Sequence, residues 1–429
     1  MVKPIVFLCL IVLLSGCLPL PTRQVTLGPT EILPDTEEML AAPVLGSTEV
    51  IRLNSNQCAS SAVTLAFPVG TEKEPPYDSR PRVILPPPEW EEEIVLPNAL
   101  PYTSLHQRSA RSIVIQAPNG NEYLWFSTGD TEDSGVYRYD PKSRQLLLYN
   151  TIDGYDAYPV DLFISSDGTL WGYTIVGYQQ EVRENLSLLS RYEPETDSFV
   201  FVNDPLLTDN GKLFTRITDM TIDRQGIIWI AVRRDKASII SFSPSTEKVI
   251  REYQLGIKEI TSLKAAPDGN LWFLSDEGVL YNFDVSDGNA TSYQYLFDAP
   301  RRIDNVLYDR IPTNTLYFDR DGKLWISDLG WLNFSSTPPT FFRIIRSPVF
   351  VNDYASPHEQ YRWEHPDAIY QSIDGSIWFS GPGLVKLTPS KAEWCLLASA
   401  PSRVAEDFEG NLWVVMFSRV YRFPLNSGQ

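Results

Sequence analysis

The sequence predicts an all-β protein, a seven-bladed β-propeller of four-stranded antiparallel blades. A Gly turn followed by an aliphatic-Trp pair occurs seven times, and successive Trp residues lie 35 to 58 residues apart, which is the period of propeller blades. No helical periodicity interrupts the short apolar runs between these motifs. Six copies share one frame, and their Trp residues are Trp171, Trp229, Trp272, Trp325, Trp378 and Trp413; the first copy, ending at Trp125, has a longer turn.

Each repeat contains the same four runs. An apolar run such as Met220 to Asp223 precedes the turn, which is usually Asp-Gly, a pair that accepts positive φ and closes a two-residue hairpin. The Trp strand follows, then a third run ending at a Pro turn, as in Val136 to Pro141, and a fourth, as in Gln145 to Tyr149. Four short strands per period predict a four-stranded blade.

The seven Trp residues have two interpretations. A large ring at an equivalent position in each blade buries apolar area against the next blade, and a packing role explains the repetition. The alternative is ligand stacking, which does not require one ring per blade. We therefore favour packing.

The last repeat predicts how the ring closes. Its first three strands are expected near Arg403 to Glu406, Leu412 to Met416 and Val420 to Phe423, after which the chain is too short for a fourth. An open blade edge would be left unpaired. We expect a stretch within Glu92 to His106 to supply the closing strand.

The motif resembles the two-component regulator propeller repeat, with its Asp-Gly-x-Leu-Trp pattern, and is similar to streptogramin lyase-like propellers, over about residues 111 to 423. The first resemblance implies a ligand-binding sensor propeller. The second implies a His base and a divalent metal, but no position matches that catalytic motif. Since propellers carry many unrelated activities, the resemblance is specific for the fold and weak for function.

The N-terminal sequence predicts the cellular location of the protein. Residues 1–17 have the form of a secretory signal peptide, too short to span a bilayer, and Leu14-Ser15-Gly16-Cys17 resembles a bacterial lipobox. This resemblance implies cleavage before Cys17 and lipidation of its thiol, which would anchor the protein to the bacterial cell envelope, facing outside the cytoplasm. The alternative is a plain signal peptide with an incidental Cys.

Residues 18–100 are expected to form a Pro-rich extended tail or linker, much of it without regular structure, and residues 101–429 the propeller. The two other cysteines of the exported chain are Cys58 in the tail and Cys395 in the sixth blade. They form either a disulfide that staples the tail to the ring or two separate thiols.

The charge limits the partners. The formal net charge is −18, which repels nucleic acid and anionic lipid headgroups, so contact with the membrane is expected only through the lipid anchor. The expected partner is an unknown small molecule, glycan or protein, cationic or neutral. No cofactor is expected, since no phosphate-binding loop or zinc-spaced Cys pair occurs.

A binding site is expected on one face of the ring. The turns between strands one and two, and three and four, are short, whereas the other loops contain nearly all insertions, including 151–159, 173–185, 203–216, 298–312, 328–339 and 352–367. Insertions on one face typically build a binding surface. Aromatic and Arg side chains in these loops either bind a ligand or pack their own loops. The candidates are Tyr178, Arg183, Arg302, Trp331, Tyr361 and Trp363.

An enzymatic function is the alternative, as an extracytoplasmic lyase or hydrolase with its site at the mouth of the central channel. His358 and His365 lie in one loop with Glu359, Glu364 and Asp367, and imidazole and carboxylate are ordinary metal or acid–base groups. Their spacing matches no recognised ligand pattern, and a solvated polar loop is the preferred explanation. We therefore predict no catalytic and no metal-binding residue, and a non-catalytic binding protein is preferred.

Overall fold

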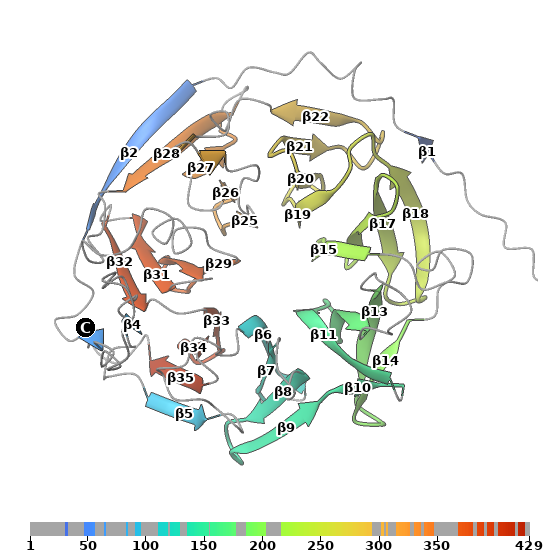
Figure 1. Cartoon of the computed structure of the whole chain (residues 1–429), viewed down its shortest axis with the longest axis vertical. Coiled ribbons are helices and arrows are strands. Elements are labelled where there is room, and N and C mark those ends of the chain that lie inside the picture. The colour runs from blue at the N-terminus through green and yellow to red at the C-terminus, as the bar shows by residue number, and fades with distance from the viewer. Residues whose placement is uncertain are drawn as a thin grey trace, which may run out of the picture.

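The structure is a computed structural model of the chain. It describes residues 31–32, 47–55, 64–65, 83–84, 91–95, 110–118, 121–128, 135–153, 155–176, 186–202, 216–293, 302–303, 306–307, 315–326, 330–335, 339–346, 368–380, 384–389, 393–398, 402–416 and 419–424. Small antiparallel sheets are arranged in a ring around an open centre (Figure 1).

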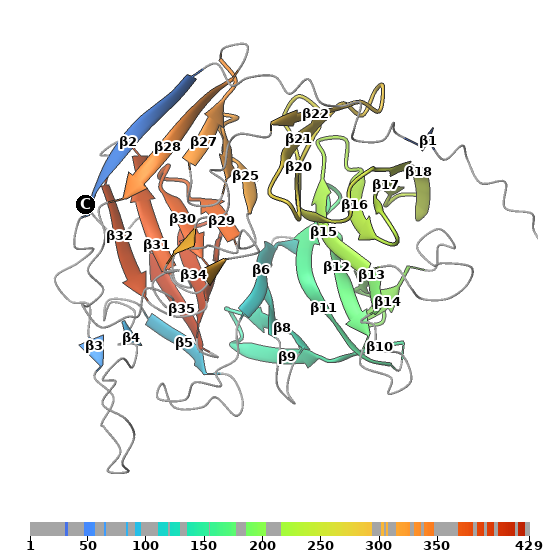
Figure 2. The same cartoon turned by 45° about the horizontal axis from the view of Figure 1, so that its top comes forward.

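Seven blades follow the chain around the ring, each with its first strand innermost and its fourth outermost (Figures 1 and 2). Blade 1 consists of β6 (Ala110–Gln116), β7 (Tyr123–Thr128), β8 (Gly135–Asp140) and β9 (Gln145–Tyr149). Blade 2 consists of β11 (Tyr155–Ile164), β12 (Leu170–Val176), β13 (Leu186–Glu193) and β14 (Ser198–Phe201). Blade 3 consists of β15 (Arg216–Ile222), β16 (Ile228–Arg233), β17 (Ala237–Ser243) and β18 (Lys248–Gln254). Blade 4 consists of β19 (Ile260–Ala265), β20 (Leu271–Ser275), β21 (Leu280–Phe283) and β22 (Ala290–Tyr293).

The remaining blades complete the ring. Blade 5 consists of β25 (Leu316–Phe318), β26 (Leu324–Ile326), β27 (Gly330–Asn333) and β28 (Thr340–Arg346). Blade 6 consists of β29 (Ala368–Gln371), β30 (Ile377–Ser380), β31 (Leu384–Thr388) and β32 (Glu393–Ala398). Blade 7 consists of β33 (Ser402–Glu406), β34 (Asn411–Met416), β35 (Arg419–Pro424) and β5 (Glu91–Val95). The predicted all-β, seven-bladed fold is confirmed. Among the described residues, no helix has the length and apolar character needed to cross a membrane.

The predicted closure by an N-terminal strand is confirmed. β5 pairs antiparallel with β35, with Val95 opposite Arg419 and Glu91 opposite Arg422, so the strand begins one residue before the expected stretch. A segment from before blade 1 thus becomes the fourth strand of blade 7. The ring is closed by backbone hydrogen bonds between β5 and β35.

The tail contributes more strands than the sequence predicts. β2 (Ser47–Ser55) runs parallel to β28 from Ser47 to Leu53, and its last two residues pair with β32. This joins the outer edges of blades 5 and 6 into one nine-stranded sheet. β1 (Glu31–Ile32) adds to the edge of blade 3, and β3 (Thr64–Leu65) pairs with β4 (Val83–Ile84). Parts of the extended tail therefore line the outside of the ring (Figure 1).

The prediction that the Asp-Gly turns are two-residue hairpin loops is wrong. In blade 2 the Ser165 amide donates to the Thr169 carbonyl (3.0 Å) and the Gly168 amide donates to the Ser165 carbonyl (2.9 Å), which places three residues in the loop. Gly168 has a φ of 85°, so a type I turn ends on a left-handed glycine. The same pair of bonds closes the turns before Trp229, Trp272, Trp325, Trp378 and Trp413.

The packing role of the repeated Trp residues is confirmed. All seven are buried, none more than 6 % exposed. Each of six packs in a core with side chains of the following blade; for example, Trp171 contacts the cluster of Ile230 and Phe242, and Trp413 that of Leu124 and Tyr139 across the closure. This packing fixes the angle between neighbouring blades and holds the inner strands around the centre.

Side chains at the start of the turn bind the indole nitrogen in four blades, whereas the buried Trp171 nitrogen has no hydrogen-bond partner among the described residues. Trp229, Trp325 and Trp413 donate to the carboxylates of Asp223, Asp319 and Asp407 at 2.7, 2.8 and 2.8 Å. Each Asp lies six residues before its Trp and also accepts backbone amides of its turn. Trp378 donates to the Ser372 hydroxyl (3.2 Å) and Trp125 to Gln116 (3.0 Å). The same side chain therefore stabilises both the turn and the position of the buried Trp ring.

Three expected insertions contain strands, and one of them, 328–339, contains β27. β10 (Thr151–Ile152) pairs with β11 and, in parallel, with β14, and β11 itself begins at Tyr155, inside the expected loop. β23 (Arg302–Ile303) pairs with β24 (Val306–Leu307). Most of the other inserted residues lie outside the described part of the chain.

Candidate functional site

The first strands of the blades line the centre of the ring (Figure 1). In the described part of the chain each of them pairs with the second strand of its blade alone, except that the first two residues of β11 also pair with β10. Unpaired amides on an inner edge need acceptors. A side chain from the preceding blade supplies them at three blade junctions. Ser112 Oγ accepts from Leu162 N (3.0 Å), Asp219 Oδ2 accepts from Leu263 N (2.7 Å), and Ser262 Oγ accepts from Leu316 N (3.2 Å). These side chains form the centre of the candidate site.

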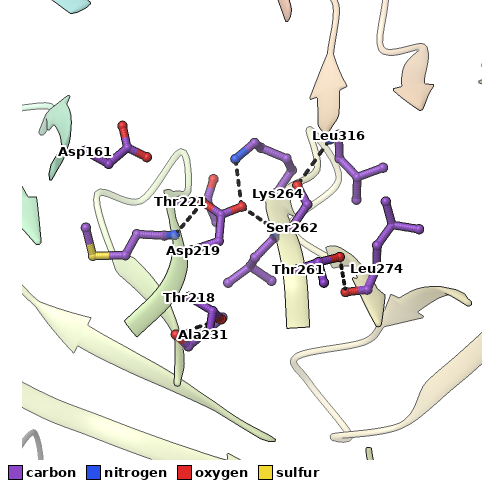
Figure 3. Close-up of polar contacts among 12 residues, drawn as sticks. Asp161, Thr218, Asp219, Thr221, Ala231, Thr261, Ser262, Lys264, Leu274 and Leu316 are labelled. Carbon is purple, nitrogen blue, oxygen red and sulfur yellow. Dashed lines mark hydrogen bonds and ion pairs between the residues drawn. The ribbon is translucent and has the colours of Figure 1, made fainter. Parts of the chain in front are cut away.

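A β-bulge positions each of these side chains. The register shifts immediately before Ser112, Asp161, Asp219 and Ser262, in the first strands of blades 1 to 4. A bulge bends the strand and redirects the side chain that follows it. In blades 3 and 4 the extra residue is Thr, whose hydroxyl donates to a carbonyl of the second strand: Thr218 to Ala231 (3.4 Å) and Thr261 to Leu274 (3.3 Å) (Figure 3).

Asp161 occupies the same position in blade 2 but has different bonds. The amide that corresponds to Leu263 is Met220 N, and it donates to Asp219 Oδ1 (2.8 Å) instead of to Asp161. Asp161 Oδ1 accepts the amide of its neighbour Leu162 (3.0 Å), and the Ser112 side chain of blade 1 is a further hydrogen-bond partner of this carboxyl. Figure 3 shows its carboxylate directed toward the Asp219–Lys264 pair on the next two blades. Asp161 therefore does not cap the next strand as its counterparts do.

Asp219, in contrast, is fully engaged. Its two oxygens accept the amides of Met220 and Leu263, and Oδ2 also lies 3.3 Å from Lys264 Nζ. The side chains of this ion pair are 14 % and 28 % exposed, which leaves Lys264 partly accessible. The group contains two carboxylates and one ammonium, so it carries one net negative charge when both carboxyls are ionised.

The pKa of the Asp161 carboxyl is raised. Burial is the largest cause, and the nearby charge of Asp219 adds to it; hydrogen bonding to Ser112, the charge of Lys264 and the Leu162 amide oppose it. Loss of hydration and a like charge both disfavour the ionised carboxyl. Asp161 is therefore suited to bind a hydrogen-bond donor or a cation, or to exchange a proton.

Gly172 makes room for this arrangement. It follows Trp171 in β12, where every other blade has a large apolar residue: Phe126, Ile230, Phe273, Ile326, Phe379 and Val414. A Cβ atom at Gly172 would lie 2.6 Å from the Asp161 carbonyl oxygen and 2.7 Å from Pro159 Cβ. The missing side chain lets β12 approach the bulge that carries Asp161.

Nearer the short turns, a second layer of side chains also accepts backbone amides of the following blade. Thr221 Oγ1 accepts from Ala265 N (3.2 Å), and the Tyr317 hydroxyl accepts from Gln371 N (3.2 Å). In blades 6 and 7 the Tyr370 hydroxyl donates to Glu406 Oε2 (3.0 Å). Burial, followed by the charge of Glu406, raises the pKa of Tyr370. This layer joins blades and leaves the Asp161 group as the less saturated part of the channel.

The candidates predicted from the sequence are not brought together in the described part of the chain. Trp331 lies in β27, not in a loop, and its ring packs against Trp325 (centroids 4.8 Å apart) and Phe342 (5.3 Å, 7° between planes). Arg302 lies in β23, opposite Leu307. The other four candidates, Tyr178, Arg183, Tyr361 and Trp363, lie outside the described residues.

The cysteine and histidine predictions fall largely outside the described residues. Cys395 lies in β32, opposite Lys386, whereas Cys17, Cys58 and the loop with His358 and His365 are not described. Within the described ranges, no group of three or more His, Cys, Asp and Glu side chains is arranged to hold a metal ion.

The sequence contains a signal for the channel group, defined here as Asp161, Asp219 and Lys264, that the loop-based prediction does not use. The residue ten positions before the Trp has the same place in each repeat of the common frame: Asp161, Asp219, Ser262, Thr315, Ala368 and Arg403. Acidic residues occur there only in blades 2 and 3. Lys264 lies two residues after Ser262 in β19. Aligning the repeats on Trp would have placed two carboxylates side by side at the axis.

The fold and site define a seven-bladed propeller with a charged central channel. No protein-family model and no curated protein matches the chain. Among solved structures, it is similar to a catalytically inactive virginiamycin B lyase from Staphylococcus aureus with quinupristin (TM-score 0.52, 16 % identity, 78 % of this chain and 98 % of the lyase covered).

The chain is also similar to the extracellular domain of a putative hybrid two-component system, BT3049, from B. thetaiotaomicron (TM-score 0.51, 16 % identity). The match covers 79 % of this chain and 41 % of that one, so this chain corresponds to less than half of the neighbour's length. The resemblance to streptogramin lyase-like and two-component sensor propellers is thus found in the structure as well, as a likeness of fold.

Proposed function

We propose that the protein is a lipid-anchored extracytoplasmic propeller that binds a ligand, without catalysis, through the loop-rich face and the central channel. The observation that carries the proposal is Asp161, a carboxylate directed toward the Asp219–Lys264 pair that lacks the cross-blade amide received by Ser112, Asp219 and Ser262. Its remaining acceptor capacity is available to a ligand. The long loops would admit and enclose that ligand.

The charges indicate the chemistry of the ligand. Asp161 accepts hydrogen bonds, while Lys264, held by Asp219 at 3.3 Å, donates them. A hydroxyl group can donate to the first and accept from the second, and an ammonium group would balance the net negative charge. With a net charge of −18 on the chain, an amine or a neutral polyhydroxy compound fits better than a polyanion.

The location rests on two supports. Leu14-Ser15-Gly16-Cys17 resembles a lipobox, so that Cys17 would carry the anchor. One solved neighbour is described as an extracellular domain. Both support an extracytoplasmic position, with the ring held at the surface of the envelope.

A second candidate function has its own support. A buried carboxyl with a raised pKa beside a second carboxyl and a Lys is a typical general acid–base arrangement. An extracytoplasmic lyase or hydrolase that uses Asp161 is therefore the alternative. Turnover of a bound compound, lost on Asp161→Asn while binding is kept, would favour this alternative over the non-catalytic proposal.

A thermal-shift screen tests the proposal. The form that lacks residues 1–17 is screened with primary amines, neutral polyols and polyanions. A compound at about a hundred times its Kd should add roughly 2.7 kcal/mol to the free energy of unfolding. We expect hits among amines or polyols, with affinity reduced at least about tenfold by Asp161→Asn.

Asp268→Asn is the matched control, because Asp268 is exposed in a turn of blade 4 and accepts the Asn270 amide. It should leave the affinity unchanged. The substitution Trp363→Ala tests the loop face; Trp331 is kept, because it packs inside blade 5 against Trp325 and Phe342. Hits confined to polyanions, or equal affinity in Asp161→Asn, would count against the channel as the binding site.

A further inference from the structure

We propose that the short-turn face of blades 6 and 7 is a docking surface for a basic protein segment that carries an apolar side chain. This surface, named here the 373/408 patch, consists of the turn residues Ile373 and Phe408 with the carboxylates around them. It lies at the opposite end of the channel from the long loops, since turns between first and second strands share one face. It is independent of the function proposed above.

The apolar residues are exposed at equivalent positions of adjacent blades. Ile373 is 63 % and Phe408 76 % exposed, and each is the first residue of its turn. The other blades of the common frame have Ser166, Arg224, Pro267 and Arg320 there. Single exposed apolar residues are ordinary, but two neighbouring large ones at a rim are a feature of interaction sites.

The backbone holds both side chains outward. The Ile373 amide donates to Glu406 Oε2 of blade 7 (2.8 Å), and the Phe408 amide donates to Glu122 Oε1 of blade 1 (3.2 Å). Each turn is therefore fixed to the next blade by its own first residue. A preorganised apolar anchor loses little conformational entropy on binding.

The surroundings of the patch favour a cationic partner. Four carboxylates, Glu122, Glu406, Asp407 and Glu409, lie beside or between these turns, against three basic groups: Lys142, which donates to Asn121 (3.2 Å), Arg422, at 3.5 Å from Glu409, and Arg320, which donates to the Ser372 carbonyl (3.3 Å). The adjacent Asp374 is paired with Lys386 (3.4 Å). Burial, then the charges of Asp407 and Glu409, raise the pKa of Glu122 despite Lys142. The local potential is thus negative.

These features specify the partner. A Lys or Arg next to an aromatic or aliphatic residue satisfies the excess carboxylates and covers Phe408 and Ile373 together. An anionic lipid surface and a second copy of this acidic chain both place negative charge against negative charge. A basic segment of another protein is the occupant that the charges favour.

Selection from a random peptide library displayed on phage, against the full-length protein, tests the proposal. We expect enriched peptides to combine Lys or Arg with an aromatic or aliphatic residue. In fluorescence anisotropy, the double variant Ile373→Ser, Phe408→Ser should weaken the best peptide by about tenfold or more. The variant Glu409→Gln should weaken it less, and raising NaCl from about 50 to about 500 mM should weaken it further.

Ile250→Ser is the control, because Ile250 is also exposed (57 %) but lies in β18 of blade 3. It should bind the peptide as the wild type does, and all variants should keep the wild-type melting temperature. Acidic or uncharged consensus peptides, or equal binding by the double variant, would overturn the proposal. So would self-association, or adsorption to phosphatidylcholine vesicles, that the Phe408→Ser change abolishes.

Discussion

At the scale of single residues, Asp161 is distinguished by what it does not bond. Ser112, Asp219 and Ser262 each accept an amide of the following blade, a role any acceptor of the right length can fill. Asp161 shares the bulge but receives no amide of the following blade, because Met220 N donates to Asp219; its partners are the Leu162 amide and the Ser112 side chain. A carboxylate held close to a like charge lowers stability, and such a cost is typical of functional sites.

The pH dependence of stability should reveal Asp161. Its raised pKa means that the native state binds more protons than the unfolded state at pH values above 3.8, the carboxyl's ordinary pKa, up to its native value. In that interval the free energy of unfolding falls as pH rises. Asp161→Asn should remove this fall, and raise the melting temperature at about pH 8 with little effect at about pH 4. A variant less stable than the wild type at both values would contradict the assignment.

Gly172→Ala tests the support of the bulge. The added Cβ would meet backbone at the Asp161 carbonyl, which cannot move without disturbing β11. We expect a loss of about 1–3 kcal/mol in the free energy of unfolding, as for overpacked cores, together with weaker ligand binding. Urea denaturation measures the first. Gly269→Ala is the control, because its Cβ meets nothing within 4 Å and only the φ of 98° is unfavourable, so ligand affinity should be unchanged.

At the scale of elements, the turn before each Trp strand joins local and core structure. Asp319 is 5 % exposed and accepts the Trp325 indole as well as the amides of Asp321 and Lys323. The three-residue loop and the buried ring therefore depend on one carboxylate.

Asp319→Ala should cost about 1–3 kcal/mol, because a buried indole N–H and turn amides lose their acceptor. Chemical denaturation, followed by the fluorescence of the buried Trp residues, measures this cost. Asp268→Ala is the comparison, since Asp268 is exposed and Trp272 is not bonded to it in the described structure. Equal losses in both variants would show that the indole bond is not the source.

Elements differ in how far the sequence predicts them. The Trp strands follow from local pattern alone, so their number and order are predictable. β1 and β2 are not, because their pairing in parallel with β18 and β28 depends on blades that lie far away in the sequence. The turn length was misjudged because Asp-Gly favours positive φ in both two- and three-residue loops. The channel charges went unnoticed because each is an ordinary strand residue until the blades are superposed.

At the scale of the whole molecule, the segment that precedes blade 1 and the last described strand meet in blade 7. β5 supplies the strand that the last repeat lacks, and the Trp413 ring packs edge-on against Tyr139 of blade 1 at 6.0 Å. This closure was predictable, because a four-stranded period with a missing last strand leaves few alternatives. The loop face was predictable only as a location, since most of its residues lie outside the described ranges.

Two truncations test the closure. A chain that begins at residue 101 lacks β5, whereas one that begins at residue 86 keeps β5 and lacks β1 and β2. In the shorter chain, the β35 amides that pair with β5 should exchange hydrogen at least about tenfold faster. In the longer chain these amides should stay protected while the edges of β28 and β32 open. Protection of β35 in both chains would refute the closure.

The ligand-binding account is tested most directly by the crystal structure of the protein with its best amine or polyol ligand. The account predicts a ligand donor within hydrogen-bonding distance of an Asp161 carboxylate oxygen, with Lys264 at the other side of the ligand. A ligand bound elsewhere, with the channel group unchanged, would contradict it.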